Sequence, residues 1–197
     1  MSTREERKEE AKRIKKLSKR IGNPLSLLVT GEHPALAQVS VDVQKTDDLS
    51  YVDQMLAVLL AARNGVGLAA NQIGVCTRVI LIWPRRFTQN GAEGITTSPE
   101  VMINPVILDH HGDPVDGEEG CLSYPGRRVR IARWPEIFCC WMNREWEPQT
   151  ASFSGFEARV VQHEIDHLFG VCQVGTGMDI GMMAPPAEVQ EAHAAYA

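Results

Sequence analysis

Two segments of the chain place apolar residues at the spacing of an amphipathic helix. The first lies between a polar stretch that can cap a helix, Thr46-Asp47-Asp48, and a stop signal, Asn64-Gly65. Its apolar positions follow the 3.6-residue period and are Val52, Met55, Leu56, Leu59 and Leu60. We therefore expect a helix that turns this face toward the core.

The second segment ends at Gly170, which is a typical stop signal for a helix. Its apolar stripe consists of Phe156, Val160, Val161, Ile165, Leu168 and Phe169. The pattern predicts a second helix that packs on the core and carries polar residues within the same turns.

Short apolar runs typical of strands lie between these two helices. Residues 79–83 indicate a buried strand, and residues 84–99, which contain Gly91, Gly94 and Pro99, indicate a loop. Further strands are expected at 101–108, at 128–134, at 136–142 and near 150–155. Because strands predominate between two long helices, we expect an α+β domain with mostly antiparallel strands.

The net charge of −5 is unevenly distributed along the 197 residues. Residues 1–20 carry nine Lys/Arg and four Glu, a net +5, which leaves −10 for the remainder. We divide the chain into a basic extension at 1–22, a folded domain at 23–174 and a Gly-, Met- and Ala-rich tail at 175–197, in which 187–197 could form a short helix. A basic extension can bind a negatively charged partner; the alternative is a solvated segment that binds nothing and is partly helical or disordered.

The sequence has neither the pattern of a membrane-spanning segment nor that of a disulfide framework. No stretch approaches the roughly 18 apolar residues of a membrane span, and the N-terminus is too charged for a signal peptide, so we expect a cytoplasmic protein. The five cysteines are an odd number and include the adjacent pair Cys139-Cys140, which argues against a disulfide framework. Cys76 and this pair fit as small core residues, whereas Cys121, in a Glu-Gly-Cys-Leu-Ser turn, does not.

The run Gln162-His163-Glu164-Ile165-Asp166-His167 lies within the second helical segment. Histidines four residues apart lie on one face of a helix and can bind one metal ion. Glu164 would lie beside that metal, where a carboxylate can take a proton from a water molecule. The run predicts a metallohydrolase; the alternative is an exposed helix with two unrelated histidines.

A catalytic metal site usually has three protein ligands and one open position, so a third ligand is needed. Downstream candidates lie in weakly patterned sequence and are Asp179, Glu188, Glu191 and His193. Cys121 is the better candidate, because a cation lowers the pKa of a thiol and the neighbouring Gly120 allows close backbone approach.

A run of small residues, Gly65-Val66-Gly67-Leu68-Ala69-Ala70-Asn71-Gln72, follows the first helix. Its glycines allow close backbone approach, and the Gln72 amide could donate to a developing oxyanion. By itself the run is more typical of a helix stop followed by a tight packing turn.

Taken together, three segments resemble the signature motifs of peptide deformylases: the run ending at Gln72, Glu119-Gly120-Cys121-Leu122-Ser123, and Gln162 through His167. The similarity extends from about Leu28 to Gly170. The resemblance implies an α+β fold whose strands pack around a central HExxH helix. It implies Fe²⁺ as the metal, with Ni²⁺, Co²⁺ or Zn²⁺ able to replace it, and the N-formylmethionyl end of a nascent polypeptide as the substrate.

Roles for individual residues follow from this resemblance. The metal ligands are Cys121, His163 and His167; Glu164 carries the proton; the Gln72 amide and the Leu122 backbone N–H stabilise the oxyanion. Backbone groups that meet an extended peptide are expected at Val66, Gly67 and Gly120. The methionine pocket is expected from Phe156, Val160 and the stem of Glu119. Arg128, or less favourably Arg127, would contact the peptide further along. The alternative is that this arginine is only an exposed, solvated residue of a strand.

Two alternatives remain beside a deformylase. One is a metallohydrolase that acts on an unformylated N-terminus, and the other is a metal-loaded binding protein, for which Glu164 and Gln72 would be unnecessary. The chain departs from the family at its end, because no Lys or Arg follows Arg159. We therefore expect any ribosome contact to use residues 1–20, in a protein that is otherwise monomeric.

Overall fold

The structure is a computed structural model that describes residues 9, 12–13, 16, 19–62, 64–83 and 99–176. The loop expected at 84–99 lies outside this part except for Pro99, and the helix expected at 187–197 lies outside it entirely. The described residues of the basic extension up to Ile21 are helical. Arg13 of this extension pairs with Asp53, which also accepts a hydrogen bond from Arg144 at 3.0 Å.

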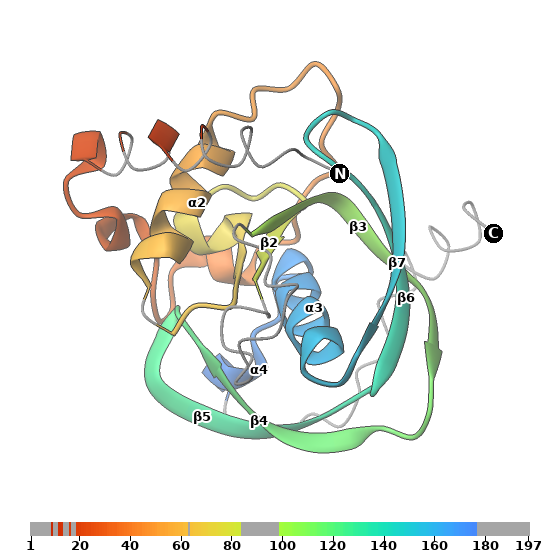
Figure 1. Ribbon diagram of the computed structural model, residues 1–197. Coiled ribbons are helices and arrows are strands. Elements are labelled where there is room, and N and C mark those ends of the chain that lie inside the picture. The colour runs from red at the N-terminus through yellow and green to blue at the C-terminus, as the bar shows by residue number, and fades with distance from the viewer. Residues whose placement is uncertain are drawn as a thin grey trace.

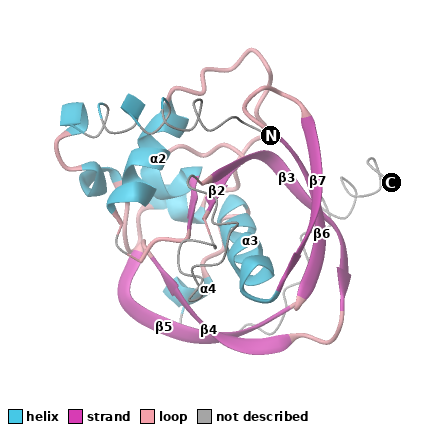
Figure 2. Cartoon of the chain, in the orientation of Figure 1, coloured by secondary structure: helices cyan, strands magenta, loops and turns pink. Residues whose placement is uncertain are grey.

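The strands of the domain form two antiparallel sheets (Figures 1 and 2). The five-stranded sheet has the order β1 (Gly67–Ala69), β2 (Val79–Ile82), β3 (Glu100–His111), β6 (Glu136–Met142) and β7 (Pro148–Ser154). The two-stranded sheet consists of β4 (Val115–Cys121) and β5 (Tyr124–Arg133). All strand pairs are antiparallel, which confirms the expected class of fold.

Helix α3 (Gly155–Leu168) lies inside the curve that the strands describe in Figure 1. Its buried residues pack with one face of β2 and β3 and with β6, in a cluster that includes Ala158, Val161, Ile165, Leu168, Ile80, Met102 and Ile137. The backbone leaves the helix through Gly170, whose φ of +69° favours glycine.

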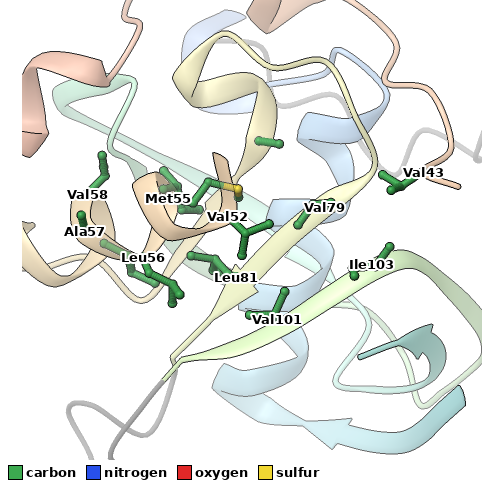
Figure 3. Packing of buried hydrophobic residues seen from close by; sticks show 13 residues of the cluster. Val43, Val52, Met55, Leu56, Ala57, Val58, Val79, Leu81, Val101 and Ile103 are labelled. Atoms are coloured by element: carbon green, nitrogen blue, oxygen red, sulfur yellow. The ribbon is translucent and has the colours of Figure 1, made fainter. Parts of the chain in front are cut away.

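Helix α2 (Tyr51–Ala61) covers the opposite face of the same strands. Figure 3 labels its residues Val52, Met55 and Leu56 beside strand residues Val79, Leu81, Val101 and Ile103. Alternate residues of β2 therefore enter different clusters, with Leu81 facing α2 and Ile80 facing α3. A strand covered on both faces needs apolar residues at every position, which explains the unbroken run Val79–Ile82.

The expected start of the first helix was wrong, and one long strand was missed. Helix α2 begins at Tyr51 with Ser50 at its N-cap, so Thr46-Asp47-Asp48 does not cap it; Asp48 instead accepts a hydrogen bond from the Ser50 N–H at 2.8 Å. Strand β4 was missed because its sequence, Val-Asp-Gly-Glu-Glu-Gly-Cys, has no regular apolar alternation. Cys121 is the last residue of β4, and the turn follows it.

Four short elements were also missed. They are the 3₁₀ helices η1 (Pro24–Leu27), η2 (Pro34–Ala37) and η3 (Ala70–Ile73), and the short helix α4 (Gln173–Thr176). The small-residue run that ends at Gln72 is therefore a short strand followed by η3 and not a simple packing turn. None of the described helices has the length and apolar character needed to cross a bilayer.

Candidate active site

A cavity of about 610 Å³ lies where β1, the β4–β5 hairpin and α3 meet. All of the site residues predicted from the sequence line it, except His167, which is fully buried. These lining residues are Val66, Gly67, Gln72, Glu119, Gly120, Cys121, Leu122, Arg128, Phe156, Val160, His163 and Glu164. Residues up to 98 positions apart in the chain thus share one cavity, whose volume suits a small peptide ligand.

Ligand-type donors gather at the buried end of this site. Cys121 Sγ lies 3.2 Å from His167 Nε2, and the donor atoms of Cys121, His167 and Cys172 all lie within 4.8 Å of one another. The ring of His163 stands edge-on to that of His167, with 5.1 Å between their centroids. The alternative ligands Asp179, Glu188, Glu191 and His193 lie outside the described residues.

The two thiols of this cluster differ in acidity. A hydrogen bond from Cys121 lowers the pKa of Cys172 to about 4, while the same contact, together with burial, raises the pKa of Cys121. The hydrogen bond between the two thiols therefore favours ionisation of Cys172 over ionisation of Cys121.

Glu119 connects the hairpin to helix α3. Its carboxylate accepts two hydrogen bonds from Arg133 at 2.9 Å each, one from Arg159 at 2.8 Å and one from His163 Nδ1 at 2.9 Å. Arg133 also donates to Asp166 Oδ2 at 2.6 Å. Glu119 and Arg133 are both buried, so this network is shielded from solvent.

The charges of this network fix the donor role of His163. Burial by itself raises the pKa of Glu119, but hydrogen bonds from His163 and Arg133 outweigh burial and lower it to about 2. Burial likewise lowers the pKa of His163, but the bond to Glu119 and the charges of Glu164 and Glu119 raise it to about 9. An ionised Glu119 can only accept, so His163 Nδ1 must donate to it, which leaves Nε2 as the atom able to bind a metal.

Glu164 lies against the backbone of β1. A Cβ added to Gly67 would collide with its carboxyl group, so the glycine is what admits Glu164 to this position. Burial raises the pKa of Glu164, although the charges of His163 and His167 oppose this. Glu164 Oε2 is buried and has no hydrogen-bond partner among the described residues.

The Gln72 amide is oriented by three contacts. Its Oε1 accepts from the Ala69 N–H at 2.8 Å, and its Nε2 donates to Cys121 Sγ at 3.3 Å and to Ser123 Oγ at 3.2 Å. The donor end of the amide therefore points at the cluster of ligand-type donors, as an oxyanion-stabilising role requires.

The cavity is bordered by two strands, each of which has a paired neighbour along one edge. Among the described strands, β1 pairs only with β2 and β4 only with β5, and both contribute lining residues. Phe156 is 55% exposed and Val160 is buried, so one side of the cavity is apolar. Arg128 lies 3.8 Å from Glu118 with both side chains mostly exposed, while Arg127 donates to the Gly175 carbonyl at 2.8 Å.

Sequence reasoning missed four contributors to the site: Cys172, Arg133, Arg159 and Asp166. Asp166 lies within the histidine motif, where its ionic role could have been considered. Arg133 and Arg159 stand in runs with no motif of their own, and only the fold brings them to Glu119.

The donor set fits a divalent metal ion. Soft thiol and borderline imidazole donors converge, His163 has the carboxylate partner that metal-bound histidines usually have, and His167 Nδ1 is buried without a partner among the described residues. Cys121, His163 and His167, with Cys172 nearby, are the residues that could hold such an ion.

Known proteins are similar to this chain in sequence and in fold. A family model described as polypeptide deformylase matches residues 25–176. A peptide deformylase from Phenylobacterium zucineum is 40% identical over 71% of this chain and 79% of its own length, and one from Brachyspira hyodysenteriae is 36% identical over 74% and 76%. A class I type b peptide deformylase from Acinetobacter baumannii, solved with Met-Ala-Ser bound, is 33% identical with a TM-score of 0.65, over 74% of this chain and 93% of that chain. The match across most of the chain means that this protein belongs to the peptide deformylase family.

Proposed function

We propose that this protein hydrolyses the N-formyl group of N-formylmethionyl polypeptides in the cavity between β1, the β4–β5 hairpin and α3, releasing formate and a free amine. Membership of the peptide deformylase family supports this activity. The observation that carries the residue assignment is the position of Glu164, whose buried carboxyl group lines the cavity beside the thiol and imidazole donors.

Cys121, His163 and His167 are the residues we assign to the metal. When bound there, a divalent ion supplies a Lewis acid that lowers the pKa of a water molecule and polarises the formyl oxygen. Fe²⁺ as the resident ion, with Ni²⁺, Co²⁺ or Zn²⁺ as substitutes, rests on the family resemblance. Glu119 supports the assignment, because it holds His163 by Nδ1.

Glu164 is the proton carrier. Its carboxylate takes a proton from the attacking water and then passes it to the nitrogen that leaves when the formyl C–N bond breaks. A site that must first accept and then donate benefits from a carboxyl pKa above its usual range, and burial moves the pKa of Glu164 in that direction.

We assign the stabilisation of the negative charge that develops on the formyl oxygen to the Gln72 amide and the Leu122 backbone N–H. Gln72 Nε2 already points toward Cys121, and its other acceptor is the Ser123 hydroxyl. The oxyanion would replace that hydroxyl as the acceptor. Donors fixed before the reaction stabilise a developing charge without the cost of reorienting.

The peptide is placed along the two strand edges. Val66 and Gly67 on one side and Gly120 on the other offer backbone groups to an extended chain, and the Acinetobacter baumannii relative binds Met-Ala-Ser. The methionine side chain is assigned to Phe156, Val160 and the stem of Glu119, whose carboxylate is held away by arginines. Arg128 would meet residues further along the peptide.

We place the enzyme in the cytoplasm as a monomer, with ribosome contact through the basic extension. Lys16, Lys19 and Arg20 of this extension are exposed, whereas Arg13 is paired with Asp53. The limits of the catalytic domain at 23–174 stay a prediction, and helix α4 crosses its C-terminal boundary.

The activity is tested by loading the anaerobically purified protein with Fe²⁺ or Ni²⁺ and supplying formyl-Met-Ala-Ser. We expect one formate per peptide and free Met-Ala-Ser, with no reaction of peptide that lacks the formyl group. Release of free methionine from the unformylated peptide, without formate, would instead identify an aminopeptidase.

Replacing the proton carrier separates catalysis from metal binding. Glu164→Gln should bind one metal ion per chain as the unmodified protein does, while turnover falls by a factor of at least about 10², because general acid–base catalysis contributes that much or more. Glu157→Gln, two turns away on α3, is the matched control and should keep full turnover. Loss of the metal from Glu164→Gln, measured by elemental analysis, would contradict the assignment.

Deleting residues 1–20 should reduce co-sedimentation with ribosomes at low salt but leave turnover of a short formyl-Met peptide nearly unchanged. Binding by the intact chain should weaken with salt with a logarithmic slope of about −0.7 to −0.9 per phosphate contacted. Deleting residues 183–197, which contain no Lys or Arg, is the control and should leave co-sedimentation intact. The proposal fails if the protein without residues 1–20 pellets as well as the full chain.

A further inference from the structure

Cys172 has no role in the reaction proposed above, yet its sulfur lies among the donors of the metal centre. The Sγ atoms of Cys172 and Cys121 and a ring nitrogen of His167 lie within 4.8 Å of one another. All three residues are buried, at 7%, 9% and 0% exposure respectively. By contrast, the buried Cys139 packs in the apolar cluster under α3 and is not part of this group of donors.

The backbone on both sides of Cys172 is held in place. At the end of α3, Gly170 N donates to the His167 carbonyl at 3.1 Å and Val171 N donates to the Asp166 carbonyl at 3.0 Å. After Cys172, its own carbonyl accepts from Gly175 N at 2.9 Å. These bonds fix the sulfur relative to His167, five residues earlier.

A second contact fixes the same segment against the hairpin that carries Cys121. Gly175 lies so close to the Tyr124 ring that a Cβ would collide with it, and Tyr124 pairs with Cys121 in the β4–β5 ladder. Cys172 and Val174 pack with Cys121 in one buried cluster. The two sulfurs are therefore brought together by the fold itself, and their proximity does not depend on a surface loop.

We propose that Cys172 is a ligand of the metal, so that the ion bound without substrate has two sulfur and two imidazole donors: Cys121, Cys172, His163 and His167. This inference rests on the proposed function, which assigns an ion to the other three residues. Two thiolates and two imidazoles are a donor set that favours Zn²⁺ and similar ions.

A fourth protein ligand has a consequence for the enzyme. Four protein donors complete a tetrahedral set, whereas hydrolysis needs one open position. Cys172 would hold that position in the absence of substrate and give it up when a formylated peptide fills the cavity. The resting site would then be closed to competing small ligands.

The direct test is X-ray absorption at the zinc edge on the full chain, loaded with one equivalent of Zn²⁺ and no peptide. We expect two sulfur neighbours at about 2.3 Å. One sulfur neighbour would overturn the site with four protein ligands, and no sulfur neighbour would overturn the assignment of both thiolates. Formate release by the same preparation reports separately on the proposed function.

Substituted proteins give a second test of whether Cys172 binds the metal. In the Co²⁺-loaded protein, Cys172→Ala should reduce the thiolate-to-cobalt charge-transfer absorption to about half, because one of two sulfur ligands is lost. Cys139→Ala, which removes a buried thiol from the cluster under α3, should leave that absorption unchanged. Equal absorption in the Cys172→Ala variant and the unmodified protein would contradict the proposal.

Discussion

The buried Glu119 carboxylate is the interaction on which the site depends. It joins β4 to Arg133 of β5 and to Arg159 and His163 of α3 through hydrogen bonds of 2.8–2.9 Å. Desolvation of such charges is costly, so the network is tolerated only because each oxygen of the carboxylate is fully engaged. The network fixes the position of Cys121, which follows Glu119 by two residues and is therefore held beside the histidines of α3.

The apolar core fixes the position of helix α3 relative to strand β1. Strands β2 and β3 are covered by α2 on one face and α3 on the other, so α3 has a fixed distance from β1. Gly67 of β1 then admits the Glu164 carboxyl group, because a Cβ there would collide with this group in its present position. Packing thus places Glu164, while the ionic network places Cys121 and His163, and the cavity lies where the two arrangements meet.

Local signals in the sequence were sufficient for part of this account. The 3.6-residue period predicted α2 and α3, the unbroken apolar run predicted β2, and the three motifs predicted which residues line the cavity. Strand β4 was missed because both of its faces carry polar residues. Arg133 and Cys172 were missed because their partners lie 14 and 51 residues away in the chain, at Glu119 and Cys121, and only the folded backbone brings them together.

The central claim is that Glu119 orients the donor set, and the affinity for Zn²⁺ tests it most directly. Competition with a chelator should show that Glu119→Gln binds Zn²⁺ about 10–100-fold more weakly than the unmodified protein, with the same far-UV circular dichroism. Glu118→Gln, at the exposed neighbouring position of β4, should bind Zn²⁺ as the unmodified protein does. Equal affinity in the Glu119→Gln variant would contradict the account.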